Sequence, residues 1–286
     1  MSGSKTAEKA KPFDGDMLYQ QRARIALPLL VRQAIAQKTI CYGELAEELG
    51  MQNARNLNFV LGSIGQSLIQ LENKWKIKIP RIQFLVVNKV DGLPGEGIGT
   101  FIPNEDYKLM SRRQRQCVVE DQLKEIFTYS KWFSVLEAFS LKPTKLNISK
   151  LLREASQGGL GGGESEHHKL LKMHVAEHPE ILDLAITDSN GSTEYPLPSG
   201  DKLDVLFECK DEWVAVEVKS HISSDGDLVR GLFQCVKYQS VLEAFLLSES
   251  RPINVRTLLV VSRKFPKGLI PLRNLLGVEV IHVKMP

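Results

Sequence analysis

Apolar and polar residues follow two different rhythms along the chain, and the change of rhythm divides it into two parts. In residues 16–105, apolar residues recur at helical spacing, and Gly50 is placed to end the second helix. The three expected helices cover 23–37, 42–50 and 53–72. The stretch 74–95, which begins with alternating polar and apolar residues at 74–79, predicts extended chain with a turn at Asp91-Gly92.

Residues 164–286 alternate helical and extended patterns instead. The expected elements are a helix at 166–177, a strand at 182–187, a hairpin at 203–219, a helix at 226–247, and strands at 257–262 and 277–283. This order predicts an α/β domain, with a mixed sheet flanked by helices. The earlier order of three helices and a strand pair predicts an N-terminal, mostly helical winged-helix domain at 16–105.

Two other segments complete the expected domain organisation. Residues 1–15 are polar and predict a disordered tail. Residues 106–163 are interpreted as a helical connector, centred on 111–140, followed by a linker. That linker is the glycine-rich run at 156–165, which lacks the Gly-Lys-Ser/Thr ending of a phosphate-binding loop.

Composition narrows the class of protein without deciding it. The 286 residues carry a net charge of only +3, which neither requires nor excludes a nucleic-acid partner. The four cysteines contain no Cys-x-x-Cys pair and are typical of a reducing compartment. Because the start is polar and no apolar run reaches membrane-spanning length, we expect a cytoplasmic protein without a membrane partner.

The predicted hairpin carries charged residues that a purely structural hairpin would not need. In a strand, alternate side chains share a face, so Glu217 and Lys219 are neighbours about 7 Å apart. The short turn between the strands lets Asp204 approach Glu217 on that face. Two carboxylates and an ammonium could hold a hard cation with a charge partner, although a sheet face with a salt bridge has the same residues.

The order of these residues resembles the PD-(D/E)XK nuclease superfamily, which has the restriction-endonuclease-like fold, over roughly residues 164–286. Glu166 opens the first helix, Asp204 begins one strand, and Glu217-Val218-Lys219 closes the next. The resemblance implies a metal-dependent endonuclease that hydrolyses DNA phosphodiester bonds with Mg²⁺ or Mn²⁺.

The same resemblance assigns roles to these residues. Asp204 and Glu217 would bind the metal, together with the backbone carbonyl of Val218. Glu166 would bind it directly or through water, with Glu164 as a competing choice, or would merely favour the helix N-terminus. Lys219 would be catalytic, orienting the attacking water or stabilising developing charge.

A further helix motif occurs in some branches of that superfamily. Gln234 and Tyr238 match its Gln-x-x-x-Tyr pattern and share a helix face with Arg230. The resemblance implies that Gln234 and Tyr238 belong to the catalytic site, steadying the lysine or contacting the DNA backbone, and Arg230 is a candidate DNA contact. The alternative is that they are ordinary residues of an amphipathic helix.

The N-terminal part resembles the DNA-binding domain of O6-alkylguanine DNA alkyltransferases and alkyltransferase-like proteins, over residues 22–100. The Tyr-Gly-Glu-Leu-Ala helix, the Ala-Arg-opened helix and the Ile-Pro segment carry this resemblance. Arg81 follows Pro80 where the family has its active cysteine, so alkyl transfer is not expected. DNA binding remains the expectation, with Arg55 and Arg81 as candidate contacts.

Three lysines add to this expectation. If 74–79 were a strand, the lysines would lie on one face, where they could contact phosphates or simply be solvated. These candidate DNA contacts are Lys74, Lys76 and Lys78.

The sequence is also compatible with two other functions and with a homodimer. A DNA-binding or regulatory protein could keep a nuclease-like fold without catalysis. His174 and His178 match the His-x-x-Glu-His pattern of inverted zinc proteases, but Pro179 disfavours helix at His178. A homodimer would allow two nuclease sites to cut two DNA strands.

Overall fold

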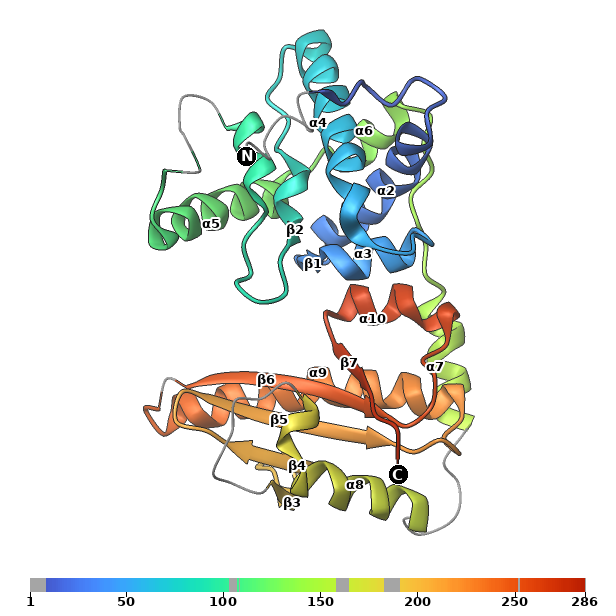
Figure 1. Ribbon diagram of the computed structural model, residues 1–286, viewed down its shortest axis with the longest axis vertical. Coiled ribbons are helices and arrows are strands. Elements are labelled where there is room, and N and C mark those ends of the chain that lie inside the picture. Colours follow the sequence, from blue (N-terminus) through green and yellow to red (C-terminus); the bar gives the residue numbers. More distant parts are fainter. Residues whose placement is uncertain are drawn as a thin grey trace. The chain divides into compact units, whose positions relative to one another are not determined.

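The chain folds into two compact units, Met1–Lys145 and Leu146–Pro286. The computed structural model describes residues 9–102, 107, 109–157, 165–182, 191–251 and 253–285. Most of the tail and of the glycine-rich linker therefore lies outside the described residues. Figure 1 shows the helices and strands of each unit.

The first unit is built mainly of helices around one hydrophobic core. Its elements are α2 (Leu18–Ile35), β1 (Ile40–Cys41), α3 (Tyr42–Glu48), η1 (Ala54–Asn56), α4 (Leu57–Trp75), η2 (Ile82–Leu85), β2 (Val86–Val87), η3 (Glu96–Phe101), α5 (Arg112–Thr128) and α6 (Trp132–Ala138). The three helices expected from the apolar spacing are present. In α4, for example, Val60, Ile64, Leu68 and Leu71 are all buried, as one helix face requires.

The segment predicted as a strand with three lysines is different in the structure. Lys74 lies in the last turn of α4, and Lys76 ends that helix in the left-handed conformation, with φ of 56°. The alternating pattern was misleading because α4 continues through it. β2 pairs in parallel with β1, so the described residues of 74–95 do not contain the expected strand pair. The expectation of a three-lysine strand face is wrong.

Helices in the expected connector belong to the two units. Val119 and Ile126 of α5, with Trp132 of α6, are buried in the core of the first unit. Helix α7 (Ile148–Gln157) contributes Ala155 to a core of the second unit, against α9.

The second unit is a five-stranded mixed sheet flanked by helices, as expected from the alternation of patterns. Strands β3, β4 and β5 pair antiparallel, whereas β5, β6 and β7 pair in parallel. The strands, in sheet order, are β3 (Ser192–Pro196), β4 (Lys202–Glu208), β5 (Glu212–Lys219), β6 (Asn254–Val261) and β7 (Glu279–His282). The helices are α7, α8 (Glu166–Glu177), α9 (Asp225–Ser248) and α10 (Ile270–Leu276).

The central strand β5 is covered on both faces. Val214 and Val216 pack in a core with Leu171 and Val175 of α8. Trp213 and Ala215 face the opposite way, into a core with Tyr238, Leu242 and Leu246 of α9. The period-2 alternation expected for the hairpin is therefore present, and it separates two apolar cores.

Some elements of this unit differ from the expected ones. Leu182 ends a 3-10 turn, and 183–187, where a strand was expected, lie outside the described residues. Strand β3 and helix α10 were not predicted from the pattern. Among the described helices, none is both long and apolar enough to cross a membrane.

Candidate functional site

The hairpin brings the two predicted carboxylates together. Val205 pairs with Val216 across β4 and β5, and one step further along this ladder Asp204 lies opposite Glu217. The short turn after Glu208 fixes this register, because Cys209 donates its N–H to the carbonyl of Glu212. The sequence correctly placed Asp204 and Glu217 side by side.

Asp204 is held by groups on two elements. Its Oδ2 accepts a hydrogen bond from the Val218 N–H at 2.8 Å, and its Oδ1 lies 3.1 Å from His168 Nε2. Burial alone would raise the pKa of Asp204, but the hydrogen bond and charge of His168, with the Val218 N–H, outweigh it and lower the pKa. The site therefore favours the ionised form of Asp204.

Glu217 has the opposite electrostatic environment, although it lies beside Asp204. Glu217 is only 3 % exposed. Burial raises the pKa of Glu217 to about 7, and the Asp204 charge adds to this, against the attraction of Lys219. The partly buried Asp204 and the buried Glu217 thus differ in how readily they ionise.

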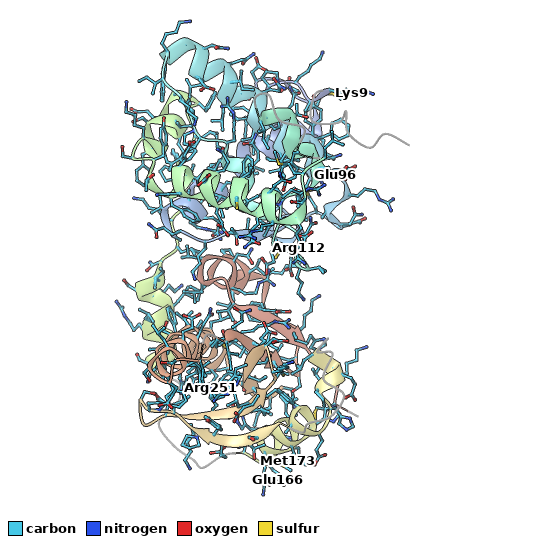
Figure 2. All side chains as sticks on the ribbon, turned by 90° about the vertical axis from the view of Figure 1, so that its left-hand side faces the viewer. Lys9, Glu96, Arg112, Glu166, Met173 and Arg251 are labelled. Atoms are coloured by element: carbon cyan, nitrogen blue, oxygen red, sulfur yellow. The ribbon has the colours of Figure 1, made fainter. Side chains whose placement is uncertain are left out.

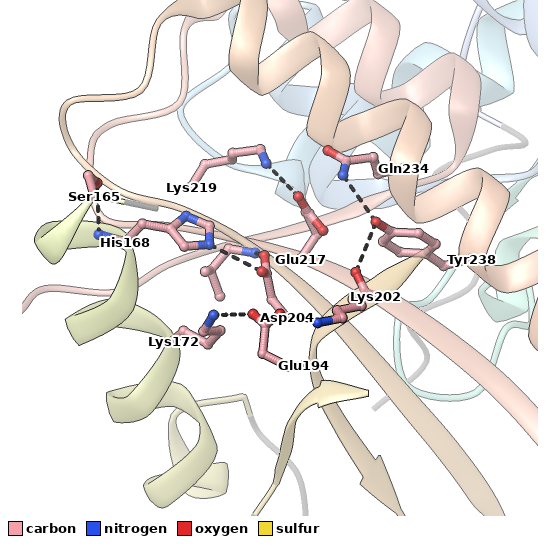
Figure 3. Close-up of polar contacts among 11 residues, drawn as sticks. Ser165, His168, Lys172, Glu194, Lys202, Asp204, Glu217, Lys219, Gln234 and Tyr238 are labelled. Carbon is pink, nitrogen blue, oxygen red and sulfur yellow. Dashed lines mark hydrogen bonds and ion pairs between the residues drawn. The ribbon is translucent and has the colours of Figure 1, made fainter. Parts of the chain in front are cut away.

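Lys219 is directed back toward Glu217. Its Nζ forms an ion pair with Glu217 Oε1 (Figure 3). Gly231 of α9 allows this approach, since a Cβ at that position would lie 3.1 Å from Lys219 Cε and 2.8 Å from Leu259 Cδ1. The absence of a side chain at Gly231 makes space for the lysine stem between sheet and helix.

Gln234 and Tyr238 contact each other on α9. Gln234 Nε2 donates to the Tyr238 hydroxyl at 3.0 Å, and that hydroxyl donates to the Lys202 carbonyl at 3.5 Å. Burial, followed by the Glu217 charge, raises the pKa of Tyr238 well above its ordinary value. Tyr238 therefore joins α9 to β4 as a neutral side chain. Among the described residues, no hydrogen bond joins either of them to Lys219.

The other predicted site residues have different surroundings. Glu166 is exposed at the start of α8 (Figure 2). Its competitor, Glu164, lies outside the described residues. Arg230 pairs with Asp227 at 2.9 Å and donates to the Ala155 carbonyl at 3.2 Å, so it connects α9 with α7.

Three residues at this site were not predicted from the sequence. His168 contacts Asp204, and Lys172, four residues later on α8, forms an ion pair with Glu194 of β3 (Figure 3). The spacing of His168 and Lys172 on one helix face was the available signal. Glu194 lies in a strand that the pattern did not reveal.

The donor set suits a hard cation in chemical type. Asp204 and Glu217 supply carboxylate oxygens, and Val218, the residue after Glu217, supplies a backbone carbonyl. Oxygen ligands of these kinds are those that Mg²⁺ prefers. In the arrangement described, these carboxylates contact His168 and Lys219 instead. No group of three or more His, Cys, Asp or Glu side chains in the described part of the chain is arranged around a metal position.

The two histidines of the His-x-x-Glu-His pattern, His174 and His178, lie next to each other near the surface. The rings of His174 and His178 lie 4.7 Å apart, and His178 Nδ1 contacts Glu180 at 2.9 Å. Helix α8 ends at Glu177, so His178 lies just beyond it. Among the described residues, this pair is not part of any group of three or more side chains that could hold a metal ion.

In the first unit, the candidate DNA contacts are in different environments. Lys78 pairs with Glu125 at 2.7 Å, and Arg81 pairs with Glu72 at 2.7 Å. Arg55 is exposed on η1 and borders a pocket of about 420 Å³. The polar and aromatic side chains around that pocket include Tyr42, Arg55, Asn58, Gln83, Asn88 and Phe101.

Comparisons with known proteins give one structural match. No protein-family model matches the chain, and no curated protein matches its sequence. A crystal structure of a repair endonuclease from Pyrococcus abyssi is matched with a TM-score of 0.31 and 20 % identity. The match covers 44 % of this chain and spans about half, 51 %, of that protein.

Proposed function

We propose that the chain is a metal-dependent nuclease whose second unit hydrolyses DNA phosphodiester bonds. The observation that carries the proposal is the junction of Asp204, Glu217 and Lys219 at one end of a buried hairpin. A buried carboxylate, a partly buried carboxylate and a partly buried ammonium meet there, although removing charge from water is costly. Residues needed only for packing would avoid that cost, so the cluster favours a chemical role.

The proposed ligands of the metal are Asp204, Glu217 and the carbonyl of Val218. When bound, Mg²⁺ or Mn²⁺ would polarise the phosphate and lower the pKa of a water molecule. His168 would hold Asp204 in its ionised form, because its ring contacts the Asp204 carboxylate. Burial of Glu217 disfavours its charge without a cation, so its environment favours binding of a positive ion.

Lys219 is the proposed catalytic cation. Its ammonium could orient the attacking water or stabilise charge developing on the phosphate. In the described arrangement it contacts Glu217, so it would exchange this partner during catalysis. Gln234 offers one replacement, because its Oε1 is buried and has no hydrogen-bond partner in the described part of the chain. Figure 3 draws Gln234 close to the Glu217–Lys219 pair.

The first unit is proposed as the DNA-binding module. Arg55 supports this, since it is exposed beside a concave pocket with polar and aromatic walls. Lys74 and Lys76 are also exposed, at the end of α4. Lys78, Arg81 and Arg230 are weaker candidates, because each already pairs with a carboxylate of the same chain.

The decisive experiment is cleavage of plasmid and linear DNA with Mg²⁺, Mn²⁺ or EDTA. We expect metal-dependent cutting that falls at least about 100-fold in Lys219→Ala. Lys210→Ala is the matched control, since Lys210 is an exposed lysine in the turn of the same hairpin. Cutting that persists in EDTA, or in Lys219→Ala, would contradict the proposal. DNA binding without any cutting would instead support a non-catalytic DNA-binding protein.

A further inference from the structure

Helix α8 contacts two neighbouring carboxylates of the sheet with two side chains one turn apart. Thr193 pairs with Val205, and Tyr195 pairs with Leu203, so Glu194 lies opposite Asp204 across β3 and β4. His168 contacts Asp204, and Lys172 contacts Glu194. Figure 3 shows both contacts between α8 and the two strands. His168 and Lys172 are four residues apart on the helix, and their partners are neighbours on adjacent strands. The helix therefore contacts the sheet at two points.

The second of these contacts is asymmetric in its burial. Lys172 is 3 % exposed, whereas the side chain of Glu194 is 48 % exposed. Removing an ion pair costs a buried charge more than an exposed one, so loss of this contact would affect Lys172 more than Glu194. Lys172 is also flanked by Leu171 and Val175, which belong to the core beneath α8.

The backbone of Glu194 points to the same dependence. Glu194 has φ of 53°, in the left-handed region that a residue with a Cβ adopts at a cost. Glycine would adopt this conformation more easily, but it would not supply a carboxylate. A glutamate at this strained position is consistent with a need for its charge beside Lys172.

We propose that Lys172 and Glu194 are positioning residues that keep His168 against Asp204. Their ion pair fixes the rotation of α8 about its axis, and His168 lies one turn away on the same face. Without that pair, α8 can shift on the sheet, and the His168 ring leaves Asp204 Oδ1. The catalytic consequence rests on the proposed nuclease function, whereas the structural consequence does not.

The first test needs no metal and no substrate. In EDTA, the ring ¹⁵N signals of His168 are assigned by NMR with a His168→Ala reference. We expect Lys172→Met to shift these signals, because the contact with Asp204 is lost. Lys169→Met is the matched control, since Lys169 is an exposed lysine of the same helix, and it should leave them unchanged. Unchanged His168 signals in folded Lys172→Met would overturn the positioning role.

Stability separates positioning from simple misfolding. Glu194→Gly should lower the denaturation midpoint, because it removes the ion pair that buried Lys172 makes with Glu194, while the glycine suits the left-handed backbone. Adding Lys172→Met should restore much of that loss, since the buried charge is then gone. The double variant should still have shifted His168 signals. A double variant with native His168 signals would contradict the proposal.

Cleavage and metal binding then test the catalytic consequence. We expect Lys172→Met to lower Mn²⁺ affinity and the cleavage rate by about tenfold or more. The double variant His168→Ala/Lys172→Met should be no slower than His168→Ala alone, because both changes remove the same contact. Additive losses would overturn the proposal. A wild-type protein that does not cut DNA would reject the nuclease function and leave the NMR result to decide the positioning role.

Discussion

Two stretches that were both expected to be strands, 74–79 and 213–219, fold in different ways. The second is strand β5, which lies between β4 and β6 and is covered by α8 and α9. The first is the end of α4 followed by chain without strand pairing in the described structure. Alternation is therefore sufficient for a strand only where neighbouring strands and two apolar layers are available.

The charged residues of the two stretches differ accordingly. Lys74, Lys76 and Lys78 are exposed, so their charges cost little. Glu217 is buried, and its charge is costly enough to raise its pKa to about 7. A charge that is retained despite such a cost is a better indicator of function than several charges on the surface.

The largest effect in this comparison should come from placing a new charge in each stretch. Val216 is completely buried, whereas Ile77 is 43 % exposed. Val216→Asp should destabilise its unit by more than about 4 kcal/mol, because an unpaired charge enters the core. Ile77→Asp should change stability by less than about 1 kcal/mol. Urea denaturation followed by circular dichroism measures both, and similar losses would contradict the different burial of the two stretches.

The same contrast explains what could be predicted from the sequence. The hairpin and α9 were predicted because their apolar periods are long and consistent with their tertiary surroundings. Asp204, Glu217 and Lys219 were found because a hairpin fixes their relation locally. The lysine strand was wrong because local alternation could not reveal that α4 continues to Trp75.

Contacts that form only when α8 packs on the sheet could not be predicted from the local sequence pattern. His168 and Lys172 acquire partners only when α8 packs on the sheet. Glu194 belongs to an edge strand whose residues are only partly buried, so its pattern is weak. Its left-handed backbone also has no signal in the sequence, since glycine would be the expected residue there.

A smaller effect should come from removing the buried charge of β5. The pKa of Glu217 rises from 4.5 to about 7 on folding. Each unit corresponds to about 1.4 kcal/mol, so its ionisation should cost the folded protein about 3 kcal/mol. This cost is absent below pH 4.5, grows as the pH rises toward 7, and is then constant. The stability of Glu217→Gln relative to wild type should therefore increase over this pH range.

Chemical denaturation in EDTA from pH 4 to 8 measures this difference. Glu217→Gln also removes the ion pair with Lys219, which changes the stability of the variant by a separate amount. The test is therefore how the stability difference between variant and wild type changes with pH. A difference that does not change with pH would contradict the raised pKa. Added Mg²⁺ should stabilise the wild type at pH 8 more than the variant, if the proposed metal ligands are correct.

The smallest effect tests the other stretch at Lys76. Because Lys76 ends α4 with φ of 56°, Lys76→Gly should stabilise the first unit by about 0.5–1 kcal/mol. Lys76→Ala is the control, since it removes the same charge and keeps the Cβ that disfavours this conformation. A strand at this position would reverse the sign, because glycine weakens a strand interior. Thermal denaturation of the two variants therefore distinguishes a helix end from the strand that alternation predicts, and a destabilised Lys76→Gly would restore the strand interpretation.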